Sequence, residues 1–156
     1  MLWLLVRTKR KALVKQALTA YDSALSCDLV DLLLLRHGIA VERHQGVDHP
    51  DRCLTPLGVE RTFKVCCRLR EFGLIADRLY SSPYRRARET AELAVKSGLA
   101  PELELVRCLE PGGDPWPLVQ RLQGSCLLVG HEPDLSQLAA ELIGARSDAL
   151  RLRKAG

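Results

Sequence analysis

From residue 31 onward, hydrophobic positions alternate between short apolar runs and amphipathic stretches. Leu32 to Leu35 is a continuous apolar run that ends at Arg36-His37-Gly38, which is typical of a buried strand opening into a loop. Further strands are predicted at 78–81, 103–106, 126–129 and, cut short by the chain end, 150–153. Helices are predicted at 55–72, 82–97, 115–123 and 133–144. This alternation predicts a three-layer α/β/α sandwich with a mostly parallel sheet, in which ligands bind at the carboxyl ends of the strands.

The helix at 55–72 has the clearest signals. Thr55-Pro56 is a favourable N-cap and first-turn pair, and Gly73 ends the helix. Apolar side chains recur at intervals of three or four residues, at Val59, Phe63, Cys66, Leu69 and Phe72.

The first 30 residues differ in character from the rest. They carry five basic residues and two acidic ones, and residues 9–21 have the pattern of a basic amphipathic helix. We interpret residues 1–30 as a basic extension that packs little against a single domain at 31–156. An organelle-targeting segment, or a segment that arises from a mis-assigned start codon, is an alternative interpretation.

Composition excludes several classes of protein. The chain has 156 residues, 47% hydrophobic and 27% charged, with a net charge of +4, which fits one globular domain and gives no broad basic field for nucleic acid. The apolar start precedes its charges, which reverses the order of a signal peptide, and no apolar run is long enough to span a membrane. Six cysteines without a C-x-x-C pair indicate reduced thiols in a cytoplasmic protein. We expect a monomer.

Polar residues follow each predicted strand. Arg36 and His37 follow the first, Ser81 and Ser82 the second, Glu110 and Asp114 the third, and His131 the fourth. Because the carboxyl ends of parallel strands meet at one edge, these residues are expected to converge there. Two histidines at equivalent strand ends, with arginines nearby, indicate a functional site.

The residue types favour phosphoryl transfer. A phosphate group is held well by guanidinium groups that each bind two oxygens, and Arg36 and Arg86 are the candidates. An imidazole nitrogen can attack phosphorus and form a phosphohistidine. The arginines supply the charge that a magnesium ion otherwise brings, and the sequence has no obvious acidic metal cluster. We therefore expect neither a metal nor a cofactor.

Four motifs together resemble the histidine phosphatase superfamily, the phosphoglycerate mutase-like group. They are Leu35-Arg36-His37-Gly38, Leu54-Thr55-Pro56-Leu57-Gly58, Ser81 to Glu92 and Val129-Gly130-His131-Glu132-Pro133-Asp134-Leu135-Ser136. Their order and spacing are those of the family over residues 31–156. The short inserts and the Gly-His-Glu-Pro form are similar to the SixA-type branch of phosphohistidine phosphatases.

The resemblance implies a role for each matching position. His37 is expected to be the nucleophile, with Arg36, Arg86 and His131 as phosphate ligands. The proton donor is expected to be Glu110, with Asp114 as the second choice. Other polar residues nearby are interpreted as solvated, rim or structural: Arg85, Arg88, Thr90, His44 and His49.

The substrate is expected to be phosphohistidine on a signalling protein, because there is little room for a lid over an engulfed metabolite. A phosphatase of small phosphorylated metabolites is the alternative within enzymes. A non-catalytic phosphate-binding regulatory protein is the alternative outside enzymes, since the resemblance implies a further C-terminal strand that is apparently truncated here. An unpaired strand edge lowers stability and invites association.

Overall fold

The computed structural model describes residues 3–9, 29–146 and 148–155. The strands are β1 (Trp3–Lys9), β2 (Leu29–Arg36), β3 (Arg78–Ser81), β4 (Leu103–Leu105) and β5 (Ser125–Gly130). The helices are α2 (Pro56–Glu71), α3 (Arg85–Lys96), the 3-10 helix η1 (Arg107–Leu109), α4 (Trp116–Val119) and α5 (Asp134–Leu142).

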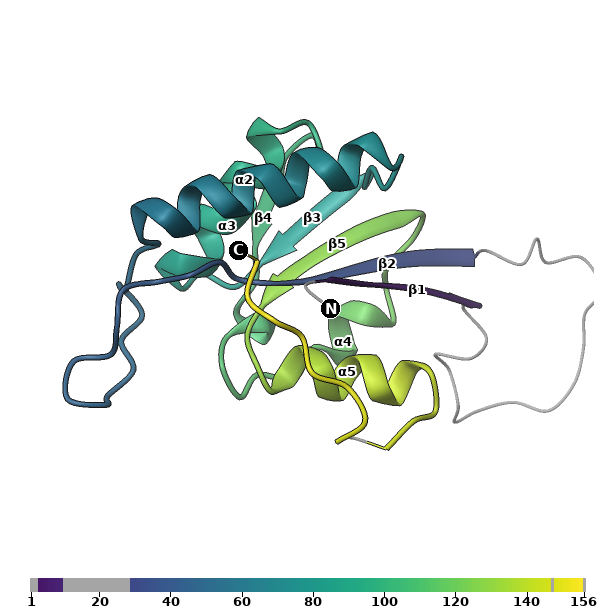
Figure 1. Ribbon diagram of the computed structural model, residues 1–156. Helices are drawn as coiled ribbons and strands as arrows, with labels where there is room; N and C mark the ends of the chain where they lie inside the picture. Colours follow the sequence, from purple (N-terminus) through teal and green to yellow (C-terminus); the bar gives the residue numbers. More distant parts are fainter. Residues whose placement is uncertain (1–2, 10–28, 147, 156) are drawn as a thin grey trace, which may run out of the picture.

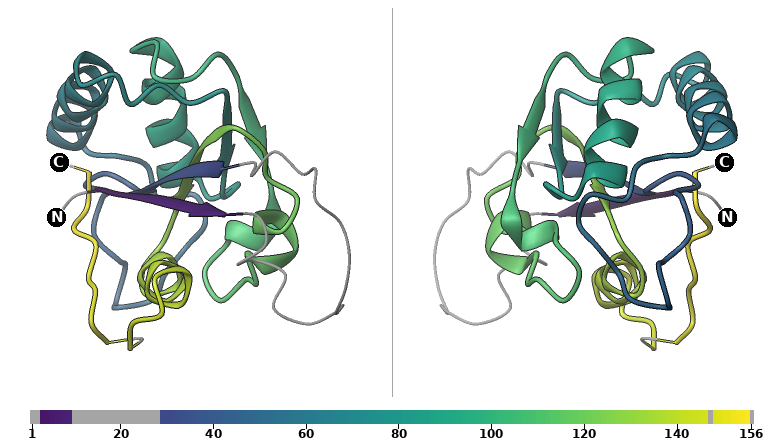
Figure 2. Two further views of the ribbon diagram at one scale, coloured as in Figure 1. Left: turned by 90° about the vertical axis from the view of Figure 1, so that its right-hand side faces the viewer. Right: turned by 90° about the vertical axis from the view of Figure 1, so that its left-hand side faces the viewer.

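The described strands form one sheet in the order β1-β2-β5-β3-β4. Strands β2, β5, β3 and β4 run parallel, and β1 is antiparallel to β2. Helices α2 and α3 cover one face of the sheet, and α4 and α5 cover the other (Figures 1 and 2). The prediction of a three-layer sandwich with a mostly parallel sheet is confirmed.

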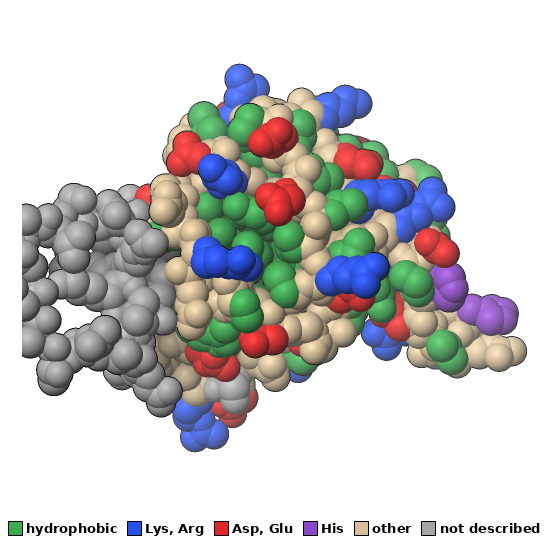
Figure 3. Space-filling model, turned by 180° about the vertical axis from the view of Figure 1, so that it is seen from behind, with side chains coloured by type: hydrophobic (Ala, Val, Ile, Leu, Met, Phe, Trp, Pro, Cys, Tyr) green, Lys and Arg blue, Asp and Glu red, His purple; other side chains and the backbone are tan. Residues whose placement is uncertain are grey.

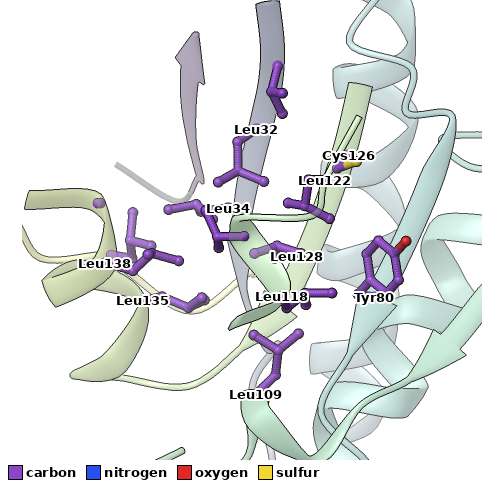
Figure 4. Packing of buried hydrophobic residues seen from close by; sticks show 14 residues of the cluster. Leu32, Leu34, Tyr80, Leu109, Leu118, Leu122, Cys126, Leu128, Leu135 and Leu138 are labelled. Carbon is purple, nitrogen blue, oxygen red and sulfur yellow. The ribbon is translucent and has the colours of Figure 1, made fainter. Parts of the chain in front are cut away.

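Strand β2 shows why the sheet needs helices on both faces. Leu32 and Leu34 belong to the apolar cluster under α4 and α5, where they meet Leu128 of β5 (Figure 4). Leu33 and Leu35 belong to the opposite cluster, under α2 and α3. Because successive side chains of a strand point to opposite faces, a continuous run of leucines requires both faces to be covered.

Helix α2 begins where the sequence predicts, but its buried face matches the predicted one only in part, at Cys66 and Leu69. Thr55 caps it by accepting a hydrogen bond from the Gly58 backbone N–H (3.0 Å). Its buried residues are Gly58, Thr62, Cys66 and Leu69, whereas Val59 and Phe72 are 40% and 71% exposed. A Cβ atom at residue 58 would collide with the Ile39 carbonyl oxygen, so close contact with the loop after β2 selects this face.

The N-terminal segment differs from the prediction in one part. Residues 3–9 were expected to pack little, but β1 pairs with β2 over its whole length, from Trp3 opposite Leu35 to Lys9 opposite Leu29. The predicted helix at 9–21 lies, apart from Lys9, outside the described residues. The division into an extension and a domain stays a prediction.

The predicted strand at 150–153 is wrong. Residues 150–154 have no strand assignment, and Ala155 forms only an isolated bridge with Gly38. The Leu152 backbone instead accepts a hydrogen bond from the Arg36 guanidinium (3.0 Å) and donates one to the Ser136 hydroxyl (3.1 Å). Because these two side chains occupy the N–H and C=O groups of Leu152, the groups cannot form hydrogen bonds with a neighbouring strand. The segment crosses the end of β2 from α5 towards α2 (Figures 1 and 2).

Candidate phosphoryl site

The two histidines meet because β2 and β5 are adjacent parallel strands. Arg36 pairs with Gly130 at the strand ends, so His37 and His131 both follow directly. The His37 backbone N–H donates to the Gly130 carbonyl (3.1 Å). The two imidazole rings lie 5.2 Å apart, centroid to centroid.

Helix α3 supplies Arg86 and fixes the loop after His37. Arg86 is 2% exposed, and its Nε lies 3.3 Å from His37 Nε2. One turn later, the Thr90 hydroxyl donates to the Arg86 carbonyl (2.7 Å) and accepts from the Gly38 backbone N–H (3.0 Å). Thr90 thus links helix α3 to the residue beside His37, as expected for a side chain with a structural role.

Hydrogen bonding sets the tautomer of His37. Its Nδ1 lies 2.8 Å from the Gly38 carbonyl oxygen, which can only accept, so Nδ1 carries the proton. The lone pair is then on Nε2, which faces Arg86. Burial, followed by the influence of His131, lowers the pKa of His37 to about 2. The ring is therefore neutral near pH 7, as a nucleophile must be.

His131 is oriented by Ser82, whose hydroxyl lies 2.9 Å from His131 Nε2. The same hydroxyl oxygen accepts from the Tyr84 backbone N–H (3.2 Å), which leaves its proton for the imidazole. In this arrangement the proton of His131 is on Nδ1. Burial, followed by the charge of Arg86, lowers the pKa of His131 to about 3.

Two buried nitrogen atoms have no hydrogen-bond partner in the described part of the chain. They are Nδ1 of His131 and Nε of Arg36. A buried donor without a partner is costly, so such atoms indicate a place for a ligand that accepts hydrogen bonds.

These residues line one pocket of about 500 Å³. The structure therefore brings together the four central residues of the prediction, namely Arg36, His37, Arg86 and His131. Further charged residues in the lining were not predicted for the site: Glu42, Arg43, Asp48, Arg52, Glu132 and Lys154.

Asp48 is the most closely engaged of these additional residues. Its carboxylate lies 2.8 Å from Arg86 Nη2 and 2.6 Å from Arg52 Nη2. Although burial opposes ionisation, the hydrogen bond from Arg52 and the charge of Arg86 lower the pKa of Asp48 below its usual value. Asp48 therefore places a fixed negative charge beside Arg86, the arginine that faces His37. The only sequence signal was its spacing of four residues from Arg52.

Neither predicted proton donor lines the pocket. Glu110 caps the 3-10 helix η1, and the Asp114 carboxylate accepts from the Trp116 backbone N–H (3.0 Å). Their neighbour Pro111 does line it. Glu132 also lines it, next to His131, and its carboxylate accepts from the Ser136 hydroxyl (2.7 Å).

The remaining polar candidates lie outside the pocket. His44 and His49 are exposed on the loop between β2 and α2, which projects at one end of the molecule (Figure 3). The Arg85 and Arg88 guanidinium groups, both about half exposed, pair with Glu89 (2.8 Å) and Glu92 (3.5 Å) on the same helix.

No group of three or more His, Cys, Asp or Glu in the described ranges is arranged to hold a metal ion. Within the same ranges, no helix has the length and hydrophobicity needed to cross a bilayer.

The site thus lies at the strand ends of an α/β sandwich and combines two buried histidines with two arginines around one pocket. The sequence profile of the histidine phosphatase superfamily (branch 1) matches residues 32–108, and the chain belongs to this superfamily.

Individual proteins are similar to the chain in sequence or in fold. The chain is 35% identical over 135 residues to an uncharacterized protein of Picosynechococcus sp., covering 81% of this chain and 82% of that protein. The protein histidine phosphatase SixA complexed with tungstate is similar in fold, with a TM-score of 0.70, 24% identity, and coverage of 80% and 83% of the two chains. The alpha-ribazole phosphatase of Shigella flexneri has a TM-score of 0.61 at 19% identity, covering 80% and 86%.

Proposed function

We propose that the protein is a metal-independent phosphatase that forms a phosphohistidine on His37 and removes phosphate from phosphohistidine on a signalling protein. The observation that carries the proposal is a neutral His37, whose unprotonated Nε2 lies 3.3 Å from Arg86 Nε, next to two buried nitrogen atoms that lack partners. Superfamily membership supports phosphatase activity.

The proposed first step is an in-line attack of His37 Nε2 on phosphorus. The bond from Nε2 to phosphorus forms while the bond from phosphorus to the leaving group breaks. Arg36 Nε, His131 Nδ1 and the Arg86 guanidinium hold the three phosphoryl oxygens. A water molecule then attacks the phosphohistidine, releases inorganic phosphate and restores His37.

The surroundings of the pocket favour a leaving nitrogen over a leaving alkoxide. Asp48, the carboxylate beside Arg86, is held ionised, and Glu110 and Asp114 lie outside the lining. The other carboxylates of the lining are Glu132, which accepts a hydrogen bond from the Ser136 hydroxyl, and the exposed Glu42. An alkoxide needs a strong proton donor, whereas the nitrogen of a phosphohistidine departs with little acid help. Phosphohistidine is therefore favoured as the substrate. The relationship in fold to SixA points the same way.

The test is turnover by the purified full chain in EDTA. It should be offered a protein domain phosphorylated on histidine, a panel of sugar phosphates and an aryl phosphate. We expect the phosphohistidine domain to be the best substrate. Preference for a sugar phosphate would indicate a metabolite phosphatase, phosphate binding without any turnover would indicate a regulatory protein, and activity restored only by magnesium would overturn the metal-independent mechanism.

A further inference from the structure

The segment after α5 returns to the pocket and places Lys154 in its lining. The flanking backbone is well fixed. The Ala155 N–H donates to the Arg36 carbonyl (3.2 Å), and the Ala155 carbonyl accepts from the buried Thr62 hydroxyl (2.7 Å). Leu152 and Ala155 are both buried. The position of Lys154 is therefore set by the fold.

Lys154 is half-buried, and it has neither an ion pair nor a side-chain hydrogen bond with any described residue. Burial lowers the pKa of its ammonium group, and the charges of Arg36, Arg52, Arg43 and Arg86 lower it further. The carboxylate of Asp48 already lies against Arg52 and Arg86. A partly desolvated cation among like charges is unfavourable until an anion reaches it.

The transferred phosphoryl group does not need this cation. In the proposed mechanism its three oxygens are held by Arg36, Arg86 and His131. The ammonium group of Lys154 is then left for a different part of the substrate.

We propose that Lys154 is a specificity-determining residue that binds a second anionic group, carried by the leaving group of the substrate. The inference rests on the proposed function for the place of the phosphoryl group. It narrows the substrate class to phosphorylated molecules, or phosphorylated protein segments, that have a carboxylate or another anion near the phosphorylated atom.

Binding of arylphosphonates tests the inference without requiring turnover. Calorimetry should compare 3- and 4-carboxyphenylphosphonate with the matching carbamoyl compounds, which are neutral and of nearly the same shape. We expect at least one carboxylate to bind the wild-type chain about tenfold more tightly than its amide, as a charge-assisted hydrogen bond provides. In Lys154→Gln this ratio should fall to about one, and in Lys154→Arg it should persist.

Lys64→Gln is the matched control, because Lys64 is an exposed lysine of α2 that pairs with Glu60 (2.6 Å) outside the pocket. In this variant the ratio of carboxylate to amide affinity should equal that of the wild type. The inference is overturned if the wild type does not discriminate, or if Lys154→Gln weakens acid and amide equally, as loss of a phosphoryl ligand would.

Turnover of the corresponding aryl phosphates separates this inference from the proposed function. If neither these compounds nor the phosphohistidine domain is hydrolysed, but the ratio of acid to amide affinity still depends on Lys154, the proposal of phosphatase activity fails and that of the second anion site does not. If all are hydrolysed but the carboxylates bind no more tightly than the amides, the proposal of phosphatase activity stands and that of the second anion site fails.

Discussion

The two sides of the pocket are built in different ways. On the strand-end side, His37 and His131 are buried, neutral, and oriented by the Gly38 carbonyl and the Ser82 hydroxyl. On the loop side, residues 41–52 are mostly exposed, and charged groups hold one another, with Asp48 between Arg52 and Arg86. Arg86 joins the two sides, since its guanidinium contacts both His37 and Asp48.

This difference predicts separate roles in catalysis and in binding for the two sides of the pocket. Groups fixed by buried backbone and short hydrogen bonds are suited to chemistry, which requires preorganised geometry. Groups held by exposed ion pairs exchange partners at low cost, because such pairs are worth little in water. We therefore expect substitutions on the strand-end side to reduce turnover, and those on the loop side to change affinity.

The largest effect is expected for His37→Ala. Without the imidazole, water must attack the substrate directly, so turnover should fall to near background and no covalent intermediate should form. The measurement is acid-labile, base-stable phosphate trapped on the protein from labelled substrate. His44→Ala, at an exposed histidine outside the pocket, is the control. It should keep both the turnover and the covalent intermediate of the wild type. Undiminished label in His37→Ala would show that another residue is the nucleophile.

Arg86→Ala is expected to have the next largest effect. It leaves the nucleophile in place but removes a clamp that strengthens during transfer, with a cost on the order of 3 to 4 kcal/mol, or a factor of hundreds in rate. Phosphoenzyme should still form, but slowly, in a rapid-quench measurement. Arg88→Ala on the same helix removes a partly exposed guanidinium paired with Glu92 and should behave as the wild type. Equal rates for both variants would contradict the assignment of Arg86.

Asp48→Asn tests the loop side. The amide oxygen can still accept from Arg86, but the negative charge beside the oxyanion is lost. Inorganic phosphate should therefore inhibit about tenfold more strongly, a change of about 1.4 kcal/mol. Asp51→Asn alters an exposed carboxylate of the same loop and should have no effect on inhibition. Weaker phosphate inhibition in Asp48→Asn would instead mean that Asp48 is needed to position Arg86.

The last prediction concerns the pH dependence of stability and not activity. The pKa values of His37 and His131 are about 2 and 3 in the fold, below the ordinary value near 6.5. Below about pH 6.5 the unfolded chain takes up protons that the folded chain does not, so stability is full above that pH and falls as the pH decreases. Each histidine contributes a slope of about 1.4 kcal/mol per pH unit.

Urea unfolding between pH 7 and pH 5 measures this slope. His131→Asn should have a shallower slope than the wild type, and His44→Ala should leave it unchanged. An identical slope in His131→Asn would show that His131 does not stay neutral in the folded chain.

The sequence predicted the strand-end side well, because its signals are local. A run of leucines defines β2, and the chemistry follows at the next residues, so Arg36 and His37 could be placed without long-range information. The register of β2 on β5 then brings His131 to the same edge. The family motifs supplied Arg86.

The loop side depends on contacts that a sequence pattern does not encode. Asp48 meets Arg86 across 38 residues of the chain. The alternation at 150–153 has the period of a strand, but Arg36 and Ser136 engage the Leu152 backbone there. Helix periodicity correctly placed α2, but the close approach of Gly58 to Ile39 determined which face is buried.

The bond between Arg36 and the Leu152 carbonyl joins residues that are 116 positions apart. During synthesis, Arg36 leaves the ribosome long before its partner. The strand that carries His37 can pair early, but Arg36 lacks this bond until residues 152–155 have emerged and crossed the end of β2. Because β5 and His131 also lie late in the chain, we expect the nascent chain to complete its sheet and to orient Arg36 only after most of it has been made.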